Sequence, residues 1–94
     1  SSVATERHLR CAFEVLAYQE LRDVLWREVK SLLSAKKYDM VRLRFVKNYT
    51  YAQIGAKYGI GKEAVRKALD RIYAILRKNQ VIRDLAAEYF NIGR

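Results

Sequence analysis

Basic and acidic side chains share one face of a predicted helix in the middle of the chain: Lys62, Glu63, Arg66, Lys67, Asp70 and Arg71. Residues four apart lie on the same side of a helix, so positions 62, 66 and 70 turn outward together, as do 63, 67 and 71. The major groove of DNA admits one helix, in which Arg and Lys donate to guanine and Glu accepts from cytosine. We therefore predict that Lys62, Glu63, Arg66 and Lys67 read base edges.

A plain solvated helix surface is the alternative for this face. In that case Glu63 would pair with Lys67, four residues further along the same helix. Glu63, an acid among basic residues, favours base reading, because a carboxylate repels phosphate. The sequence keeps both interpretations open.

The charge of the chain is concentrated around this helix. The net charge is +9, and residues 35–78 contain twelve basic and three acidic residues, while residues 1–34 and 79–94 are each balanced. A localised basic excess is typical of a polyanion-binding surface. Several basic or hydroxyl-bearing side chains within it are predicted to hold phosphates. These are Lys47, Tyr49, Thr50, Tyr51, Lys57 and Arg71.

Catalytic and metal chemistry find little support. His8 precedes Cys11 by three residues on one helix face, but two ligands do not make a zinc site, which needs four. No Gly-rich or oxyanion motif accompanies the pair. We expect no enzyme activity, no metal and no cofactor. The single cysteine excludes an intrachain disulfide, which favours a reducing cytoplasm.

A helix-turn-helix is predicted to hold the basic face. Thr50 and Gln53 form a capping box that starts a helix ending at Tyr58, and Gly59 is placed as its left-handed stop. Tyr49 and Ile54 occupy the positions of a hydrophobic staple. A second helix is expected from Gly61 to about Lys78. Gly55, inside the first helix, indicates a close backbone approach, since a mid-helix glycine otherwise costs about 1 kcal/mol.

The side chains predicted to form the core of this motif are apolar residues at helical spacing. We expect Ile54 and Tyr58 to face the second helix and Ile60 to fill the turn. The buried stripe of the second helix is Val65, Ala68, Leu69 and Ile72.

Three further helices complete an all-α prediction, because the chain has no proline and four glycines. Residues 5–33 read as one helix capped by Thr5, or as two helices with a bend near 18–20. A connector over 34–37 leads to a helix over 38–47, and the last helix covers 81–90. Two groups of side chains are expected to face inward: Met40, Val41, Leu43, Phe45 and Val46, then Val81, Ile82, Leu85, Ala86 and Phe90.

The motif resembles region four of the sigma-70 family. Leu43-Arg44-Phe45, Thr50, Gly59-Ile60 and Lys62–Arg66 match its pattern, which covers about 45 residues. The resemblance implies base contacts by Lys62, Glu63, Arg66 and Lys67, and it adds RNA polymerase as a partner. Two positions depart from the family: Gly61 replaces a Ser or Thr cap, and Lys67 replaces a common Gln, so base preference does not transfer.

The predicted organisation has three segments: 1–34 for docking or dimerisation, 35–78 as the helix-turn-helix, and 79–94 as a C-terminal helix. The predicted function is sequence-specific binding of double-stranded DNA, in transcription regulation or sigma-like promoter recognition. The alternative is a protein-interaction module of a larger nucleoprotein assembly with non-specific DNA contact. Residues 5–33 are the expected homodimer surface, since their apolar stripe needs a partner. No apolar run reaches the roughly 20 residues that span a bilayer, so no membrane partner is expected.

Overall fold

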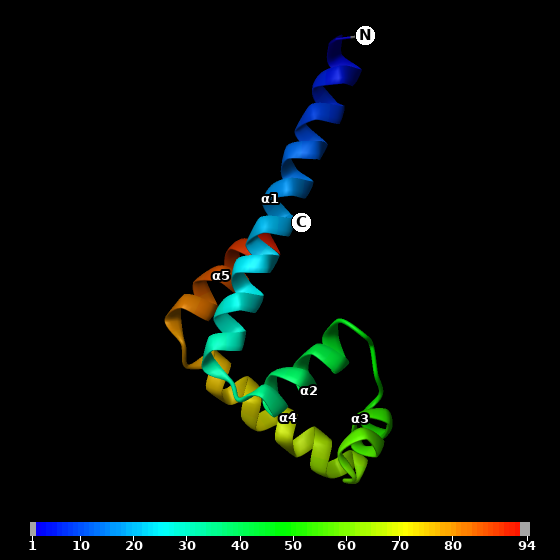
Figure 1. Ribbon diagram of the computed structural model, residues 1–94. Coiled ribbons are helices and arrows are strands. Elements are labelled where there is room, and N and C mark those ends of the chain that lie inside the picture. Colours follow the sequence, from blue (N-terminus) through cyan, green and yellow to red (C-terminus); the bar gives the residue numbers. More distant parts are fainter. Residues whose placement is uncertain (1, 93–94) are drawn as a thin grey trace.

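The computed structural model describes the backbone of residues 2–92 and the side chains of residues 6–91. Within them the chain forms five helices, α1 (Ser2–Leu32), α2 (Ala35–Phe45), α3 (Tyr51–Tyr58), α4 (Lys62–Arg77) and α5 (Gln80–Ile92), and no strand. Figure 1 shows α2, α3 and α4 as one unit, from which α1 rises with α5 along its lower half. The all-α prediction is confirmed.

The first helix is continuous, without a bend at 18–20 (Figure 1). Thr5 lies inside α1 and therefore does not cap it, contrary to the prediction. The half nearest α2 packs against α5, where the rings of Tyr18 and Tyr89 lie 4.3 Å apart and Val29 is buried. The other half extends past α5. Its Leu9, Phe13 and Leu16 side chains are each more than half exposed.

The second helix begins earlier than predicted. Ser34 is its N-cap, and the Ser34 hydroxyl accepts a hydrogen bond from the amide of Lys37 at 3.4 Å. The prediction of a connector over 34–37 was therefore wrong, because α2 already begins at Ala35. Met40, Val41 and Leu43 are buried as expected. Phe45 and Val46 are instead exposed, because they lie where α2 ends. The ring of Phe45 keeps one edge-on contact, with Tyr73.

The last helix is capped by Asn79, whose Oδ1 accepts from the amide of Ile82 at 3.0 Å. Ile82 is buried and Leu85 half-buried, in line with the prediction. Val81, Ala86 and Phe90 are exposed, so their inward placement was wrong. The physical reason is that α5 packs mainly against α1 and to a lesser extent against α4, and a narrow stripe suffices to cover that surface.

One hydrophobic cluster joins α2, α3 and α4. Its buried members are Met40, Val41, Leu43, Ile54, Val65, Leu69 and Ile72. Tyr49, Tyr58 and Ala68 pack against it, which agrees with the predicted staple and stripe. Ile60 is 37% exposed and does not fill the turn, so that prediction was wrong.

The turn between α3 and α4 is fixed by backbone contacts. Both arms of the capping box form: Thr50 Oγ1 accepts from the Gln53 amide at 3.1 Å, and Gln53 Oε1 accepts from the Thr50 amide at 2.8 Å. Gly59 is left-handed, with φ 70°. A Cβ on Gly55 would lie 2.3 Å from the carbonyl oxygen of Ile60. The close approach inferred from Gly55 therefore exists, and its partner is the turn itself.

A carboxylate ties α2 to the end of α3. Asp39 accepts hydrogen bonds from Lys57 Nζ at 2.7 Å and from the Tyr58 hydroxyl. The bond from Lys57, followed by that from Tyr58, holds the pKa of Asp39 below its usual value. Desolvation, with the same hydrogen bond, raises the pKa of Tyr58 to about 12. The charged carboxylate and the neutral phenol are therefore the stable pair at neutral pH.

Substitution of Gly55 tests the turn. We expect Gly55→Ala to lower the free energy of unfolding by about 1–3 kcal/mol, because the new methyl group meets the rigid Ile60 carbonyl. Gly61→Ser is the matched control: nothing lies within 4 Å of a Cβ there, and serine supplies the missing cap. Urea unfolding monitored by circular dichroism measures both. Equal stability of the Gly55→Ala variant and the parent chain would contradict the close approach.

The Asp39 contact gives a pH dependence. A carboxyl group whose pKa is lowered by folding stabilises the fold above its unfolded pKa, and this contribution disappears as the pH falls through the lowered folded pKa. We expect Asp39→Asn to cost less than about 1 kcal/mol at pH 7, since the carboxylate is partly exposed. The difference between the two proteins should shrink below the usual Asp pKa of 3.8. Urea midpoints across pH 2.5–7 measure it; a difference independent of pH would refute this role.

Candidate nucleic-acid interface

The helix α4 has a buried apolar side and an exposed charged side. Val65, Leu69 and Ile72 are buried on one side. Lys62, Glu63, Arg66, Lys67, Asp70 and Arg71 are all exposed on the other. The structure therefore brings together the four predicted base-reading residues on one solvent-facing surface, which we call the α4 face.

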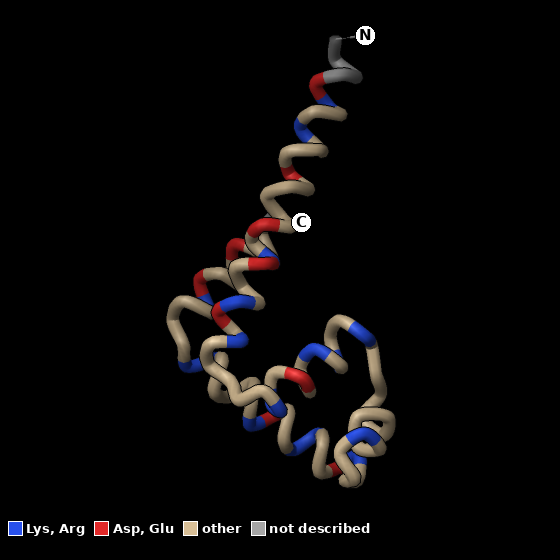
Figure 2. The backbone as a smooth tube through the Cα atoms, in the orientation of Figure 1, with Lys and Arg blue, Asp and Glu red and all other residues tan. Residues whose placement is uncertain are grey.

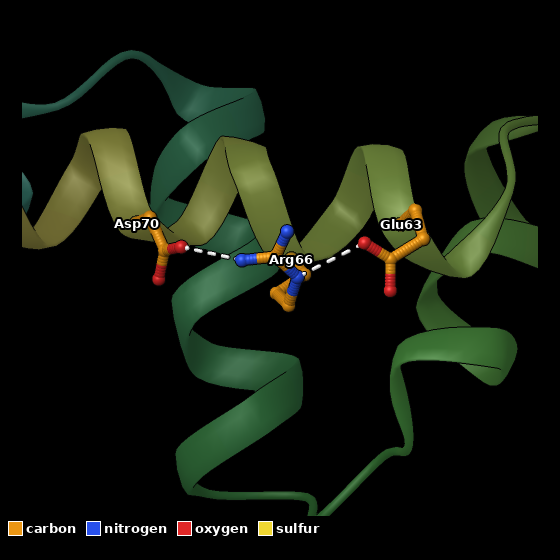
Figure 3. A network of polar contacts seen from close by, with 3 residues as sticks. All are labelled: Glu63, Arg66 and Asp70. Carbon is orange, nitrogen blue, oxygen red and sulfur yellow. Dashed lines mark hydrogen bonds and ion pairs between the residues drawn. The ribbon is translucent and has the colours of Figure 1, made fainter.

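Arg66 is held at the centre of the α4 face by two carboxylates. Its Nε donates to Glu63 Oε2 and its Nη1 to Asp70 Oδ2, both at 3.1 Å (Figure 3). The hydrogen bond to Glu63 is the main cause that raises the pKa of Arg66, so the guanidinium stays charged. Glu63 therefore pairs with Arg66, three residues further along the helix, and not with Lys67 as the alternative interpretation predicted.

This arrangement sets the orientation of the guanidinium. Two of its nitrogens point along the helix axis toward Glu63 and Asp70 (Figure 3), and the remaining N–H groups are left for a ligand. Arginine has five N–H donors in a fixed fork, so two intrahelical bonds do not exhaust them. The two carboxylates also offset the attraction of Arg66 for phosphate, which favours a neutral hydrogen-bond acceptor such as a base edge.

The start of α4 carries no side-chain cap. Gly61 is the N-cap and makes no side-chain hydrogen bond, as its residue type dictates. The first amides of a helix have no partner within the helix and carry partial positive charge. The end of α4 nearest Lys62 therefore presents both backbone and side-chain donors.

The residues predicted to hold phosphates fall into two groups. Tyr51 lies beside the α4 face, near enough to contribute to the raised pKa of Arg66, and Arg71 is exposed on α4 itself. Lys57 is paired with Asp39 at 2.7 Å, and Lys47 also acts on the pKa of Asp39. These two lysines gather around one carboxylate, away from the α4 face.

Thr50 and Tyr49, both predicted to hold phosphates, also stabilise the fold. The Thr50 hydroxyl is occupied by the capping box. Tyr49 is half-buried, and its carbonyl oxygen accepts from Arg44 Nη1 at 3.0 Å. Both residues position the first turn of α3.

Arg44 has a structural role that the sequence pattern did not predict. Its guanidinium lies over the ring of Tyr51 at 4.8 Å and bonds to Tyr49, so it fastens α2 to the start of α3. The only signal in the sequence was its place between two apolar residues in Leu43-Arg44-Phe45, where an outward cation is equally plausible.

The basic excess of residues 35–78 lies on α2, α3 and α4 in the structure. Figure 2 shows Lys and Arg spread over α2, α3 and α4, whereas red positions are frequent along α1 and α5. Among the described residues no group of His, Cys, Asp and Glu is arranged to hold a metal ion. None of the described helices is long and apolar enough to span a membrane.

A family model for sigma-70, region 4 matches residues 31–78, about half of the 94-residue chain. This segment contains α2, α3 and α4 and ends just after α4. Searches of curated proteins and of solved structures gave no match. Sigma-70 region 4 is a family of helix-turn-helix DNA-binding domains of transcription and not a family of enzymes. The matched segment is the one that holds the capping box, the left-handed glycine and the α4 face, and the chain belongs to the sigma-70 region 4 family.

Proposed function

We propose that this protein recognises a specific double-stranded DNA sequence by placing the α4 face in the major groove. The observation that carries the proposal is the exposed set Lys62, Glu63, Arg66 and Lys67, on the side of α4 opposite the buried Val65 and Leu69. A helix with one face in the core and one polar face free is the form in which helix-turn-helix proteins read bases.

Arg66 is the proposed main reader. It lies one turn into α4, and the carboxylates of Glu63 and Asp70 hold its guanidinium before DNA arrives. A side chain fixed in advance loses less conformational entropy on binding than a free one. Its free N–H groups suit the O6 and N7 acceptors of guanine, while Glu63 accepts from a neighbouring cytosine amino group.

The proposed phosphate contacts surround this reader. Arg71, on the α4 face itself, and Tyr51, which lies beside that face and directly follows Thr50, would with Thr50 bind the nearer backbone strand. Tyr49 belongs to the same turn. Lys47 and Lys57 lie around Asp39 and would add long-range attraction. Such contacts position a protein on DNA and make binding dependent on salt.

Within transcription, we propose promoter recognition together with RNA polymerase. The support is membership of the sigma-70 region 4 family, whose matched segment includes the whole of the helix-turn-helix. Gly61 and Lys67 differ from the usual family residues, so the preferred sequence is a property of this chain.

A second proposal concerns α1. Leu9, Phe13 and Leu16 are exposed on the half of α1 that extends past α5. An isolated helix of fewer than about 12–15 residues is marginal in water, so this half gains stability from a covering partner. We propose that a second copy of the chain covers it, which agrees with the charge balance of residues 1–34.

Two arginines on α4 separate base reading from phosphate binding. A duplex selected from a random pool is compared with a scrambled duplex by fluorescence anisotropy over a range of salt. We expect Arg66→Ala to weaken binding to the selected duplex by about tenfold or more and to relax the preference at one base pair. Arg71→Ala removes the same charge from the same helix. It should weaken both duplexes alike and lower the log–log salt slope by about one.

The outcome that refutes the proposal is equal loss on both duplexes for both variants. In that case α4 binds DNA without reading it. Circular dichroism of each variant shows whether the helical content is unchanged.

Dimer formation is tested on the exposed half of α1. We expect sedimentation of the parent chain at micromolar concentration to give the mass of two copies, and Phe13→Glu to give one, because a buried charge is not tolerated in an apolar contact. Gln19→Glu adds the same charge at an exposed position outside this set and should remain a dimer. A monomeric parent chain would exclude the second copy as the cover.

A further inference from the structure

A cleft of 510 Å³ lies between α1 and α2, outside the α4 face. We call it the α1–α2 cleft. The residues that matter for its chemistry are Arg22, Trp26, Arg27, Lys30, Tyr38 and Arg42. A neighbouring hollow shares Lys30, Tyr38 and Arg42 and continues to Lys47 and to Asp39, whose carboxylate already accepts hydrogen bonds from Lys57 and Tyr58. The two together form an elongated, basic and aromatic surface that the proposed DNA reading does not use.

Positive charge exceeds negative charge in this cleft. Four cations line it, and the carboxylate on its wall, Asp23, lies 3.7 Å from Arg22. Among the described residues Arg27, Lys30 and Arg42 form no ion pair. Three cations without carboxylate partners, brought to one concave surface, favour an anionic ligand.

Two aromatic rings hold the cations in place. The guanidinium of Arg42 lies 4.9 Å from the ring centre of Trp26, and Lys30 Nζ lies 5.9 Å from that of Tyr38. The rings themselves meet edge to face at 6.2 Å. A guanidinium stacked on a ring still presents its N–H edge, which pairs with a carboxylate through two parallel bonds.

The cleft and the α4 face lie on opposite sides of the core. On α2, Tyr38 and Arg42 are one turn apart, on the side away from the buried Met40 and Leu43. Those two residues join the cluster that also contains Val65 and Leu69 of α4. The core therefore separates the cleft from the α4 face, and DNA in contact with that face leaves the cleft open.

We propose that the α1–α2 cleft binds an acidic peptide segment of a partner protein. A duplex is too large, since its major groove alone is about 12 Å wide. Single-stranded nucleic acid binds by stacking bases on free aromatic faces, and here Trp26 and Tyr38 each already carry a cation on one face. Carboxylates spaced along an extended peptide match the row from Arg27 through Lys30 and Arg42 to Lys47. This inference goes beyond the proposed DNA reading and does not depend on it.

Trp26 is the only tryptophan of the chain, so its fluorescence reports on the cleft. The probe is hexaglutamate, titrated into the whole chain at about 0.1 M salt, with hexalysine as the charge control. We expect a saturable change in Trp26 emission with hexaglutamate and none with hexalysine. Arg27→Gln and Arg42→Gln should each weaken binding by about threefold to tenfold, which corresponds to the net contribution of one ordinary hydrogen bond.

Arg71→Gln is the matched control, because it removes one positive charge from the α4 face. It should leave the hexaglutamate affinity within about twofold, since exposed charges on opposite sides of the core are screened over a Debye length of about 10 Å. If it weakens binding as much as Arg42→Gln does, the ligand is held by net charge and the proposal is overturned. Arg27→Gln guards against loss of folding, since Arg27 is exposed and outside the core cluster.

A second titration distinguishes this site from the DNA surface. The chain is first saturated with a duplex, and hexaglutamate is then added. We expect the same affinity as without DNA, because the two ligands occupy opposite sides of the core. Displacement of either ligand by the other would show that the cleft belongs to the DNA surface and would overturn the proposal. A chain that binds no DNA at all would refute the proposed function and leave the first titration as the test of the cleft.

Discussion

The contact between Gly55 and the carbonyl of Ile60 determines how the rest of the motif is arranged. A side chain at position 55 would lie 2.3 Å from that oxygen, so the chain can turn this sharply only where residue 55 has no Cβ. Gly59 contributes the left-handed residue that ends α3, and its amide donates to the Gly55 carbonyl. These two glycines fix the turn between α3 and α4 through backbone contacts alone. The direction of the α4 face follows from that turn, because Val65 and Leu69 must reach Ile54 in the core.

Two kinds of contact hold this motif against α2, one apolar and one polar, and they fix different aspects of its position. The apolar cluster from Met40 to Ile72 is buried and non-directional, so it fixes proximity. Arg44 and Asp39 fix orientation, since Arg44 bonds to the carbonyl of Tyr49 and Asp39 to both Lys57 and Tyr58. Each polar contact joins α2 to one end of α3. The polar contacts therefore lie on α2 and α3, and α4 is held through its buried side chains Val65, Leu69 and Ile72, which leaves the α4 face free.

Local signals in the sequence were enough to predict where α3 begins and ends, but not which side chains are buried or which helices they contact. The capping box at Thr50 and the stop at Gly59 depend on residues within a few positions, and both are present. Ile60, Phe45 and Phe90 were placed inward by helical spacing, yet each is exposed, because spacing does not tell where the neighbouring surface ends. Arg44 and Asp39 were missed for the same reason. Their partners are five to nineteen residues away, and nothing in the local pattern indicates which helix end each will meet.

The α4 face carries its own negative charges, and this has a consequence for selectivity. Glu63 and Asp70 lie on either side of Arg66, so any phosphate that approaches Arg66 meets two carboxylates as well. A base edge, which is neutral, meets no such repulsion and can accept the N–H groups that the carboxylates leave free. Attraction to the DNA backbone must then come from cations without such neighbours, such as Arg71. Under the proposed function, separation of the two tasks between different side chains of one helix would allow a basic protein to distinguish one sequence from the large excess of others that attract it equally by charge.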